Sequence, residues 1–411
     1  MDQPAAANDA KSEGQDSRRG LVMYFLRLGT IGFGGPAALI GYMRRDLVER
    51  DKVVDESTYN LALALAQIMP GPLAAQTAIG IGYFQGGVLS ATLVGLAFVL
   101  PSFLMVLGLS ALYVAYGGLP WMQALFYGIG AVVIAIIAIA AYRLARSTNK
   151  RDPLLWSIFG ALLLATVWSG TELAPLFLLA GLVAVLVRGW PGGNRAALIT
   201  TAVLVAGGLI FALEQFLNTA GGGVGGGGLW LQILLFFTKA GSFVFGSGLA
   251  IIPFLQQGVV HDFGWLTDHQ FLDAVAVALI TPGPVVITVA FIGYLVGYAV
   301  AGTVGGVAGA SLAAIGIFLP VYFFTIIPAP WFRRHRDNPQ LRAFVSGTTA
   351  AASGAIAGAV LLLGQRAIFD IPTAVIAAVG LILLWRYRVQ EPYLVIGAGV
   401  AGLVLFPIFR G

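Results

Sequence analysis

The sequence predicts an all-helical membrane protein that crosses the bilayer many times and consists of two related halves. Of its 411 residues, 58% are hydrophobic and only 10% are charged, whereas water-soluble domains average about 25% charged residues. Apolar runs of about 20 residues, the length of a membrane-spanning helix, recur along the whole chain. A helical span satisfies its backbone polar groups within itself, so helix is the expected structure throughout.

An internal repeat divides the chain into two halves. Pro282-Gly283-Pro284 lies 212 residues after Pro70-Gly71-Pro72, and the segment FTKAGSFVFGSG, from Phe237, lies the same distance after FLRLGTIGFGGP, from Phe25. Helices that glycine and proline break at matching places in two halves point to a transport site in membrane proteins. The repeat therefore predicts a transporter whose site lies between the halves.

Each half contains six apolar units of similar length and order. The expected units are 21–45, 57–86, 88–116, 120–146, 153–170 and 172–188 in the first half, and 229–258, 268–298, 300–327, 341–366, 370–386 and 391–409 in the second. An extra apolar segment, about 195–218, brings the total to about 13. We expect four regions: a disordered cytoplasmic tail (1–20), a first transport repeat (21–190), a linking membrane helix with a glycine-rich tether (191–228), and a second transport repeat (229–411).

Loop charges predict that the second repeat is inverted relative to the first. The loop after the first unit contains Arg44, Arg45, Arg50 and Lys52, whereas the equivalent loop, about 258–268, has no lysine or arginine. If the first two units of each half are re-entrant hairpins, the dense basic clusters fall on the cytoplasmic side together with the N-terminus. If the first unit spans once instead, the basic loop falls on the opposite side. The charges favour hairpins.

The glycine and proline motifs predict breaks in the helices. A glycine costs about 1 kcal/mol and a proline about 3 kcal/mol in a helix interior. A break at Gly34-Gly35-Pro36, or at the later proline–glycine–proline motifs, leaves unpaired backbone groups and a helix N-terminus, which favours an anion. Glycines also permit close helix packing, which is the alternative explanation. The motifs recur in both halves at a single offset along the chain, and this recurrence favours the functional explanation, anion binding at the breaks.

Two basic residues occupy equivalent positions beside these breaks. Charges inside a membrane segment are costly and usually functional, although long basic side chains can also extend to the interface. Arginine offers a planar fork suited to a tetrahedral oxyanion, and uncharged donors can replace the water around one. The candidate substrate-binding residues are Arg27, Thr30, Gly34, Gly35, Pro36, Gln67, Pro70, Gly71, Pro72, Gln76, Lys239, Ser242, Gly246, Ser247, Thr281, Pro282, Gly283, Pro284 and Thr288.

Carboxylates near the breaks are candidates for proton coupling. They are Asp46, Glu49, Asp55, Glu56, Asp268 and Asp273, most of them expected to be solvated loop charges. Asp273 is the foremost candidate because it begins an apolar run and aligns with Leu61. The chain has no cysteine, its three histidines show no metal-ligand spacing, and no phosphate-binding glycine loop precedes a Lys-Ser/Thr pair. We expect no metal, no cofactor, no direct use of ATP and no nucleic acid partner.

These motifs resemble those of the chromate ion transporter family in its long, two-domain form. The segments FLRLGTIGFGGPAALIGYM and LALAQIMPGPLAAQTAIGIGYFQGG carry the resemblance, with weaker FGSG and TPGP copies later. It implies a bacterial inner-membrane protein, an antiporter by expectation, that exports chromate by using the proton gradient or membrane potential and so confers chromate resistance. It also implies roles for the glycine–proline motifs and for Arg27 and Lys239. FGSGLA in place of FGGPAA suggests unequal contributions from the halves.

Three other functions remain open at this point. One is a transporter of sulfate, a tetrahedral dianion that would compete with chromate, or of another oxyanion. Another is an anion channel, which the sequence excludes less well. The last is a membrane enzyme acting on lipid, which would need an intramembrane constellation of catalytic residues that the apolar segments do not contain. The oligomeric state is open as well, with a homodimer as one expectation.

Overall fold

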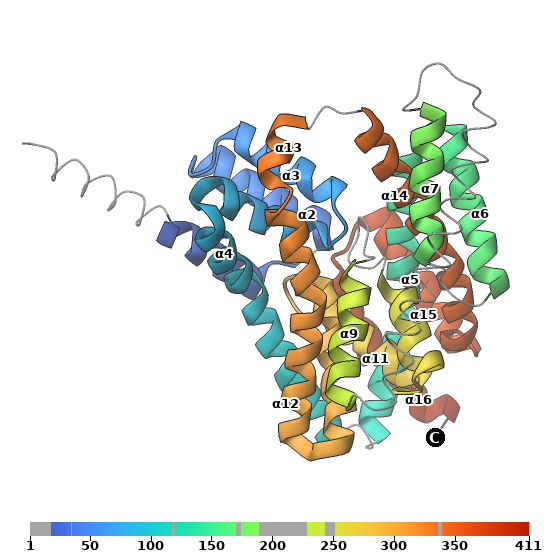
Figure 1. The fold of residues 1–411 in the computed structure, drawn as a ribbon. Helices are drawn as coiled ribbons and strands as arrows, with labels where there is room; N and C mark the ends of the chain where they lie inside the picture. The colour runs from blue at the N-terminus through green and yellow to red at the C-terminus, as the bar shows by residue number, and fades with distance from the viewer. Residues whose placement is uncertain are drawn as a thin grey trace, which may run out of the picture.

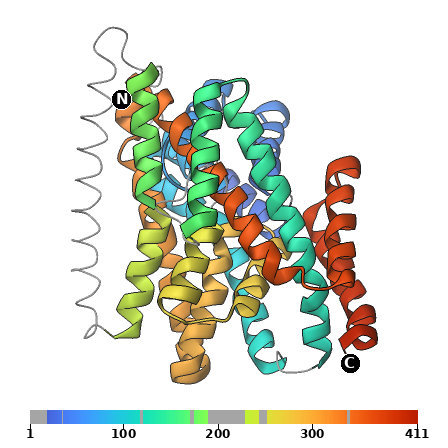
Figure 2. The same ribbon diagram turned by 90° about the vertical axis from the view of Figure 1, so that its right-hand side faces the viewer.

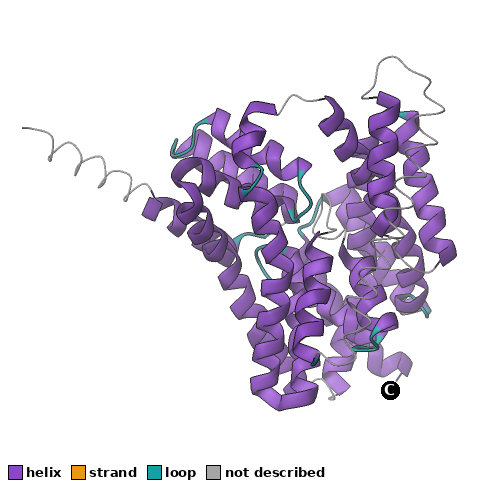
Figure 3. Cartoon of the chain, in the orientation of Figure 1, coloured by secondary structure: helices purple, strands orange, loops and turns teal. Residues whose placement is uncertain are grey.

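All regular structure in the described part of the chain is helical (Figure 3). This structure is a computed structural model, and it describes residues 18–33, 35–116, 120–169, 174–188, 228–242, 251–335 and 339–410. The all-helical prediction is therefore confirmed for these residues. The predicted linking segment, the glycine tether, most of the N-terminal tail, and Gly34, Gly246 and Ser247 lie outside them.

The helices follow the order of the predicted units (Figure 1). A helix over residues 18–31 begins the first half, so residues 18–20 belong to it and not to the tail. It is followed by α2 (Gly35–Met43), η1 (Arg44–Arg50), α3 (Glu56–Ile68), α4 (Leu73–Tyr116), α5 (Pro120–Asn149), α6 (Pro153–Ser169) and α7 (Ala174–Arg188). The second half contains α9 (Leu229–Ser242), α10 (Ile252–Gln256), η4 (Gln257–Asp262), α11 (Asp268–Ile280), η5 (Val285–Ile287), α12 (Thr288–Ile326), α13 (Ala329–His335), α14 (Pro339–Ala367), α15 (Ile371–Ile382), η6 (Leu383–Tyr387) and α16 (Glu391–Arg410).

Five of the described helical segments are long and apolar enough to cross a membrane. They are Leu73–Tyr116, Trp121–Asn149, Val285–Arg333, Arg342–Gln365 and Glu391–Phe409, and shorter apolar helices accompany them. These lengths and compositions agree with a polytopic membrane protein. The total of 13 segments stays a prediction, because the extra segment lies outside the described residues.

The two longest helices, α4 and α12, each fold back on themselves. Gly87 in α4 and Gly302 in α12 have φ angles of +68° and +59°, in the left-handed region that glycine tolerates. In α12 the backbones of Gly293 and Gly309 then lie side by side, with no room for a side chain between them. Each helix thus consists of two arms, and the bends fall near the boundaries predicted at residues 86–88 and 298–300.

The predicted helix breaks form the tips of hairpins. The first helix ends at Ile31 and α2 begins at Gly35, while α3 ends at Ile68 and α4 begins at Leu73. The two arms of the second hairpin pack closely, because Gly80 of α4 contacts Ala62 of α3. Proline and glycine therefore terminate both helices where their helix propensities predict.

The second half repeats this backbone pattern. α11 ends at Ile280, immediately before the second proline–glycine–proline motif. Gly71 and Gly283 both have positive φ angles, +147° and +94°. Asp55 and Thr267, which are repeat partners, both cap the following helix by accepting a hydrogen bond from a backbone N–H. The repeat seen in the sequence is thus also a repeat of local structure.

The two halves are interlocked rather than merely side by side. Helix α5 of the first half packs along α15 and α16 of the second, while α14 of the second half packs along α6 and α7 of the first. Figure 2 shows α14 crossing the molecule beside α6 and α7. α4 and α12 also pack against each other. The fold therefore needs both repeats, and the breaks of both lie near their interface.

The glycine contact in α12 generates a stability prediction. We expect Gly293→Ala to destabilise the protein by about 1–3 kcal/mol, because its methyl group would overlap the Gly309 carbonyl. Gly108→Ala in α4 is the control, since nothing lies within 4 Å of the added atom. Thermal unfolding of the detergent-solubilised variants measures the difference, and equal melting temperatures would contradict the close packing.

Candidate functional site

The tip of one second-half hairpin contacts the tip of the first hairpin of the chain. The backbone N–H of Gly283 donates a hydrogen bond to the carbonyl of Gly32 over 2.9 Å. Ser102 of α4 lies between the same segments: its hydroxyl donates to the carbonyl of Pro282 over 2.7 Å and lies 3.3 Å from the carbonyl of Gly29. Ser102 is fully buried. Backbone groups that lose their helical partner at a break therefore form hydrogen bonds with groups of the other repeat.

The same helix crossing occurs in both halves, but only one contains this hydroxyl. Gly29 lies directly against the backbone of Phe98, and its repeat partner Gly241 lies in the same way against Ile317. Four residues further along each helix, the first half has Ser102 and the second has Val321. A valine cannot donate a hydrogen bond, so the halves differ chemically at equivalent places. This difference extends the asymmetry that the sequence shows at FGGP and FGSG.

Gln76 closes the tip of the second hairpin. Its side-chain nitrogen donates to the carbonyl of Pro70 over 2.7 Å, and Gly71 lies directly against its amide group. Its Oε1 is buried and has no hydrogen-bond partner in the described part of the structure. One of the two N–H donors of the Gln76 amide is thus used within the hairpin, and its role in binding an anion stays a prediction.

The four predicted hydroxyl donors that lie within the described residues are engaged with backbone carbonyls of their own segments. Each of the four donates to a backbone carbonyl three or four residues earlier, over 2.7–3.1 Å: Thr30 to Leu26, Ser242 to Thr238, Thr281 to Val277, and Thr288 to Val285. Such bonds are common for hydroxyls in apolar helices. These side chains must therefore rotate before they can bind a ligand.

The predicted site residues differ in their exposure. Arg27, Gln67 and Lys239 are exposed, and neither Arg27 nor Lys239 forms an ion pair with a described residue. Pro36 is half-buried at the start of α2, and Pro72, Pro282 and Pro284 are buried at the other tips. The prolines of the breaks are thus more buried than the two basic residues.

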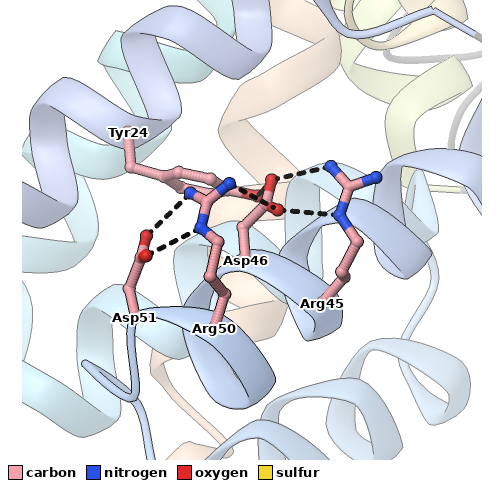
Figure 4. A network of polar contacts seen from close by, with 5 residues as sticks. All are labelled: Tyr24, Arg45, Asp46, Arg50 and Asp51. Atoms are coloured by element: carbon pink, nitrogen blue, oxygen red, sulfur yellow. Dashed lines mark hydrogen bonds and ion pairs between the residues drawn. The ribbon is translucent and has the colours of Figure 1, made fainter.

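Asp46 belongs to a network of charges in η1 (Figure 4). Its carboxylate lies 2.8 Å from Arg45 and 3.4 Å from Arg50, and the Tyr24 hydroxyl lies 3.5 Å away. Arg50 also pairs with Asp51, which lowers the pKa of that carboxyl. A buried charge with such partners ties the first helix to η1 and is structural.

The remaining loop carboxylates also have structural partners. Glu49 and Glu56 both pair with Arg44, and Asp268 accepts a hydrogen bond from Gln256. Asp55 caps α3, and the hydrogen bonds that Ser57 and Thr58 donate lower its pKa to about 2. A carboxyl that is ionised throughout the physiological range cannot carry protons there. Asp55 therefore does not serve as a proton carrier.

Asp273 differs from all of these carboxylates. It is buried, accepts a hydrogen bond of 2.7 Å from the Tyr113 hydroxyl, and borders a cavity of about 770 Å³. The sequence pointed to Asp273, but it did not reveal that Tyr113 binds this carboxylate or that Ser102 binds the carbonyl of Pro282. Both lie on α4, more than 150 residues away from the residues they contact. Ser102 had one local signal, a hydroxyl next to Pro101 in an apolar helix.

The contact between the tips generates a second stability prediction. We expect Gly283→Ala to destabilise the protein more than Gly264→Ala. Both glycines have positive φ angles, +94° and +60°, which cost a side chain about 1–2 kcal/mol. Only at Gly283 would the added methyl also overlap the Ser102 side chain, whereas nothing lies within 4 Å at Gly264. Thermal unfolding measures both variants, and an equal loss in the two would argue against a tight contact.

Comparisons with known proteins identify the family. The chromate transporter family model matches residues 19–190 and again residues 231–403, so both halves match it. A chromate transport protein of Cupriavidus metallidurans is 52% identical over 95% of this chain and 94% of its own. A probable chromate transport protein of Synechococcus elongatus is 49% identical over 95% and 96%.

A third relative extends the similarity to greater distance. A chromate transport protein of Pseudomonas aeruginosa is 32% identical over 98% of this chain and 97% of its own. No solved structure matches this chain. The two matched halves, the paired helix breaks and the near full-length relatives lead to one conclusion: the chain belongs to the chromate transporter family.

Proposed function

We propose that this protein is a secondary transporter that exports chromate across the bacterial inner membrane and so confers chromate resistance. The observation that carries the proposal is the contact between two broken-helix tips from different halves. In transporters with inverted repeats, substrate binds at such breaks, and one repeat moves against the other around it. The family and the names of its full-length relatives supply the substrate.

The donors at the tips suit a tetrahedral oxyanion. In the described conformation the Gly283 N–H and the Ser102 hydroxyl both bind backbone carbonyls of the opposite half or hairpin. When the tips separate, these donors become free, and a dianion replaces the carbonyls. Arg27 and Lys239 supply positive charge from equivalent places in the two repeats, and Arg can bind two oxygens at once. Sulfate has the same shape and charge and competes.

The arrangement of basic segments supports an inverted repeat with a cytoplasmic N-terminus. α13, which contains Arg333 and Arg334, lies beside α3 at the top of Figure 1, and η1 with its arginines adjoins α3 along the chain. The C-terminal end of α16 lies at the opposite end. By the positive-inside rule the basic end is cytoplasmic. The first two units of each half then enter and leave the membrane on the same side as re-entrant hairpins.

Coupling to the proton gradient or membrane potential separates this proposal from an anion channel. A channel cannot concentrate its substrate. The purified protein in liposomes should therefore accumulate chromate above the external concentration when a gradient is imposed. The accumulation should disappear when an ionophore dissipates the gradient. Passive equilibration under both conditions would favour the channel. Adding sulfate in the same assay measures its competition.

The basic pair generates a transport prediction. A charge-assisted hydrogen bond contributes about 1.5–3 kcal/mol, so Arg27→Ala and Lys239→Ala should each reduce chromate uptake into everted vesicles about tenfold or more. Lys150→Ala is the matched control, because it removes an exposed basic residue from a loop remote from the breaks in sequence. Normal uptake in both site variants would remove the basic pair from the mechanism.

Ser102 generates a prediction about substrate affinity. Ser102→Ala removes a donor at the tips and should raise the KM for chromate. It also removes a hydrogen bond to the buried Pro282 carbonyl, at a cost of about 1–3 kcal/mol in stability. Ser110→Ala is the control, because Ser110 is equally buried in the same helix but donates only to its own helix, at Val106. Uptake kinetics in everted vesicles separate the two. An equal effect of both substitutions would assign Ser102 a packing role only.

A further inference from the structure

A cavity of about 770 Å³ lies at one end of the molecule, away from the contact between the tips. It is bordered by the last turns of α4, α14 and α16 and by the first turns of α5 and α11. Its polar lining consists of Tyr113, Gln123, Tyr127, His269 and Asp273. Because a water molecule occupies about 30 Å³ of liquid, this cavity is large enough for a chain of waters. It adjoins the C-terminal end of α16, opposite α13 in Figure 1.

Two residues of α11 connect the surface with the buried end of this cavity. His269 is exposed in the first turn of the helix, and Asp273 is buried one turn further along. Residues four apart lie on the same face of a helix. The cavity, which both side chains border, therefore leads from solvent to the carboxylate.

Among the described residues, Asp273 has no counter-ion. The ionisable groups around the cavity are Tyr113 from α4, Tyr127 from α5 and His269 from α11 itself, and the Tyr127 hydroxyl donates to Asp370. α12 contributes the ring of Phe291 against Tyr113, while α14 and α16 contribute apolar residues. No lysine or arginine of the described chain lines the cavity. A buried carboxylate without a cationic partner gains most by binding a proton.

α4 links this carboxylate to the contact between the tips. Tyr113 and Ser102 lie three turns apart on α4; one binds Asp273 and the other binds the carbonyl of Pro282. Asp273 and Pro282 in turn lie at the middle and just beyond the end of α11. The first half therefore holds the second-half hairpin through two hydrogen bonds, Tyr113 to Asp273 and Ser102 to Pro282. Because both bonds join the same two segments, a change of charge at Asp273 affects the contact at Pro282.

We propose that Asp273 takes up the proton that drives chromate export, and that the proton reaches it through this cavity from the external side. This inference rests on the proposed function and its membrane orientation. A proton from water adds to a carboxylate oxygen, which neutralises Asp273 and weakens the bond from Tyr113. The hairpin then moves relative to α4 and the tips separate. Release of the proton to the cytoplasm restores the carboxylate.

The test uses the purified full-length protein in liposomes with radiolabelled chromate. Chromate-for-chromate exchange reports substrate binding and movement, whereas accumulation under an imposed pH gradient reports proton coupling. We expect Asp273→Asn, which keeps the shape but cannot carry the proton, to retain exchange and lose accumulation. Asp262→Asn removes an exposed carboxylate of η4 and should retain both.

Tyr113→Phe provides the second variant, which decides the matter if Asp273→Asn does not fold. Loss of its hydrogen bond should move the pH of half-maximal accumulation upward by about half to one unit, the size of one hydrogen bond. Three results would overturn the assignment of Asp273. The first is accumulation by Asp273→Asn at the level of the unmodified protein, and the second is loss of exchange together with accumulation in folded Asp273→Asn. The third is an unchanged pH profile in Tyr113→Phe. Absence of chromate exchange in the unmodified protein would instead overturn the proposed function.

Discussion

The need to satisfy broken backbone inside an apolar protein governs this structure. A helix that ends in the middle of the membrane leaves N–H and carbonyl groups that lipid cannot bind. Here the freed groups of one half find partners in the other, at the hydrogen bond from Gly283 to Gly32 and through the hydroxyl of Ser102. The interlocked packing of α5 and α14 with the opposite halves holds these tips in place. Each repeat is thus incomplete without its partner.

The two repeats share a backbone pattern but have different side-chain chemistry. In the first half η1 contains Arg45, Asp46 and Arg50, which form a charge network, whereas the matching positions of η4 are Gln257, Gly258 and Asp262. In the second half Asp273 replaces Leu61 and faces a cavity. The first half thus has basic residues where the matching segment of the second half has no lysine or arginine, and the second half has a buried carboxylate where the first has a leucine. Duplication followed by such divergence gives the two repeats different chemistry at equivalent positions.

The position of α4 explains how distant parts of the molecule could act together. Its second arm touches the first hairpin through Phe98, the second-half tip through Ser102, and α11 through Tyr113. Because α4 is a rigid helix with three such contacts along its length, a small displacement at one contact is transmitted to the other two. Weak polar contacts between closely packed helices permit such movement, whereas the ion pairs of η1 resist it.

The sequence by itself determined the helical class, the two halves and the places where helices break, because these follow from local physics. Apolar length specifies a span, and glycine and proline terminate a helix wherever they stand, so the ends at Ile68 and Ile280 agree with prediction. Only the tertiary structure decided that the hairpin tip at Gly283 contacts the tip at Gly32. It alone also showed that Ser102 binds Pro282 and that Tyr113 binds Asp273. It also left Arg27 and Lys239 exposed, without an ion pair to a described residue. Such pairings join residues far apart in the chain, and no local pattern records them, since they arise from how the two halves pack.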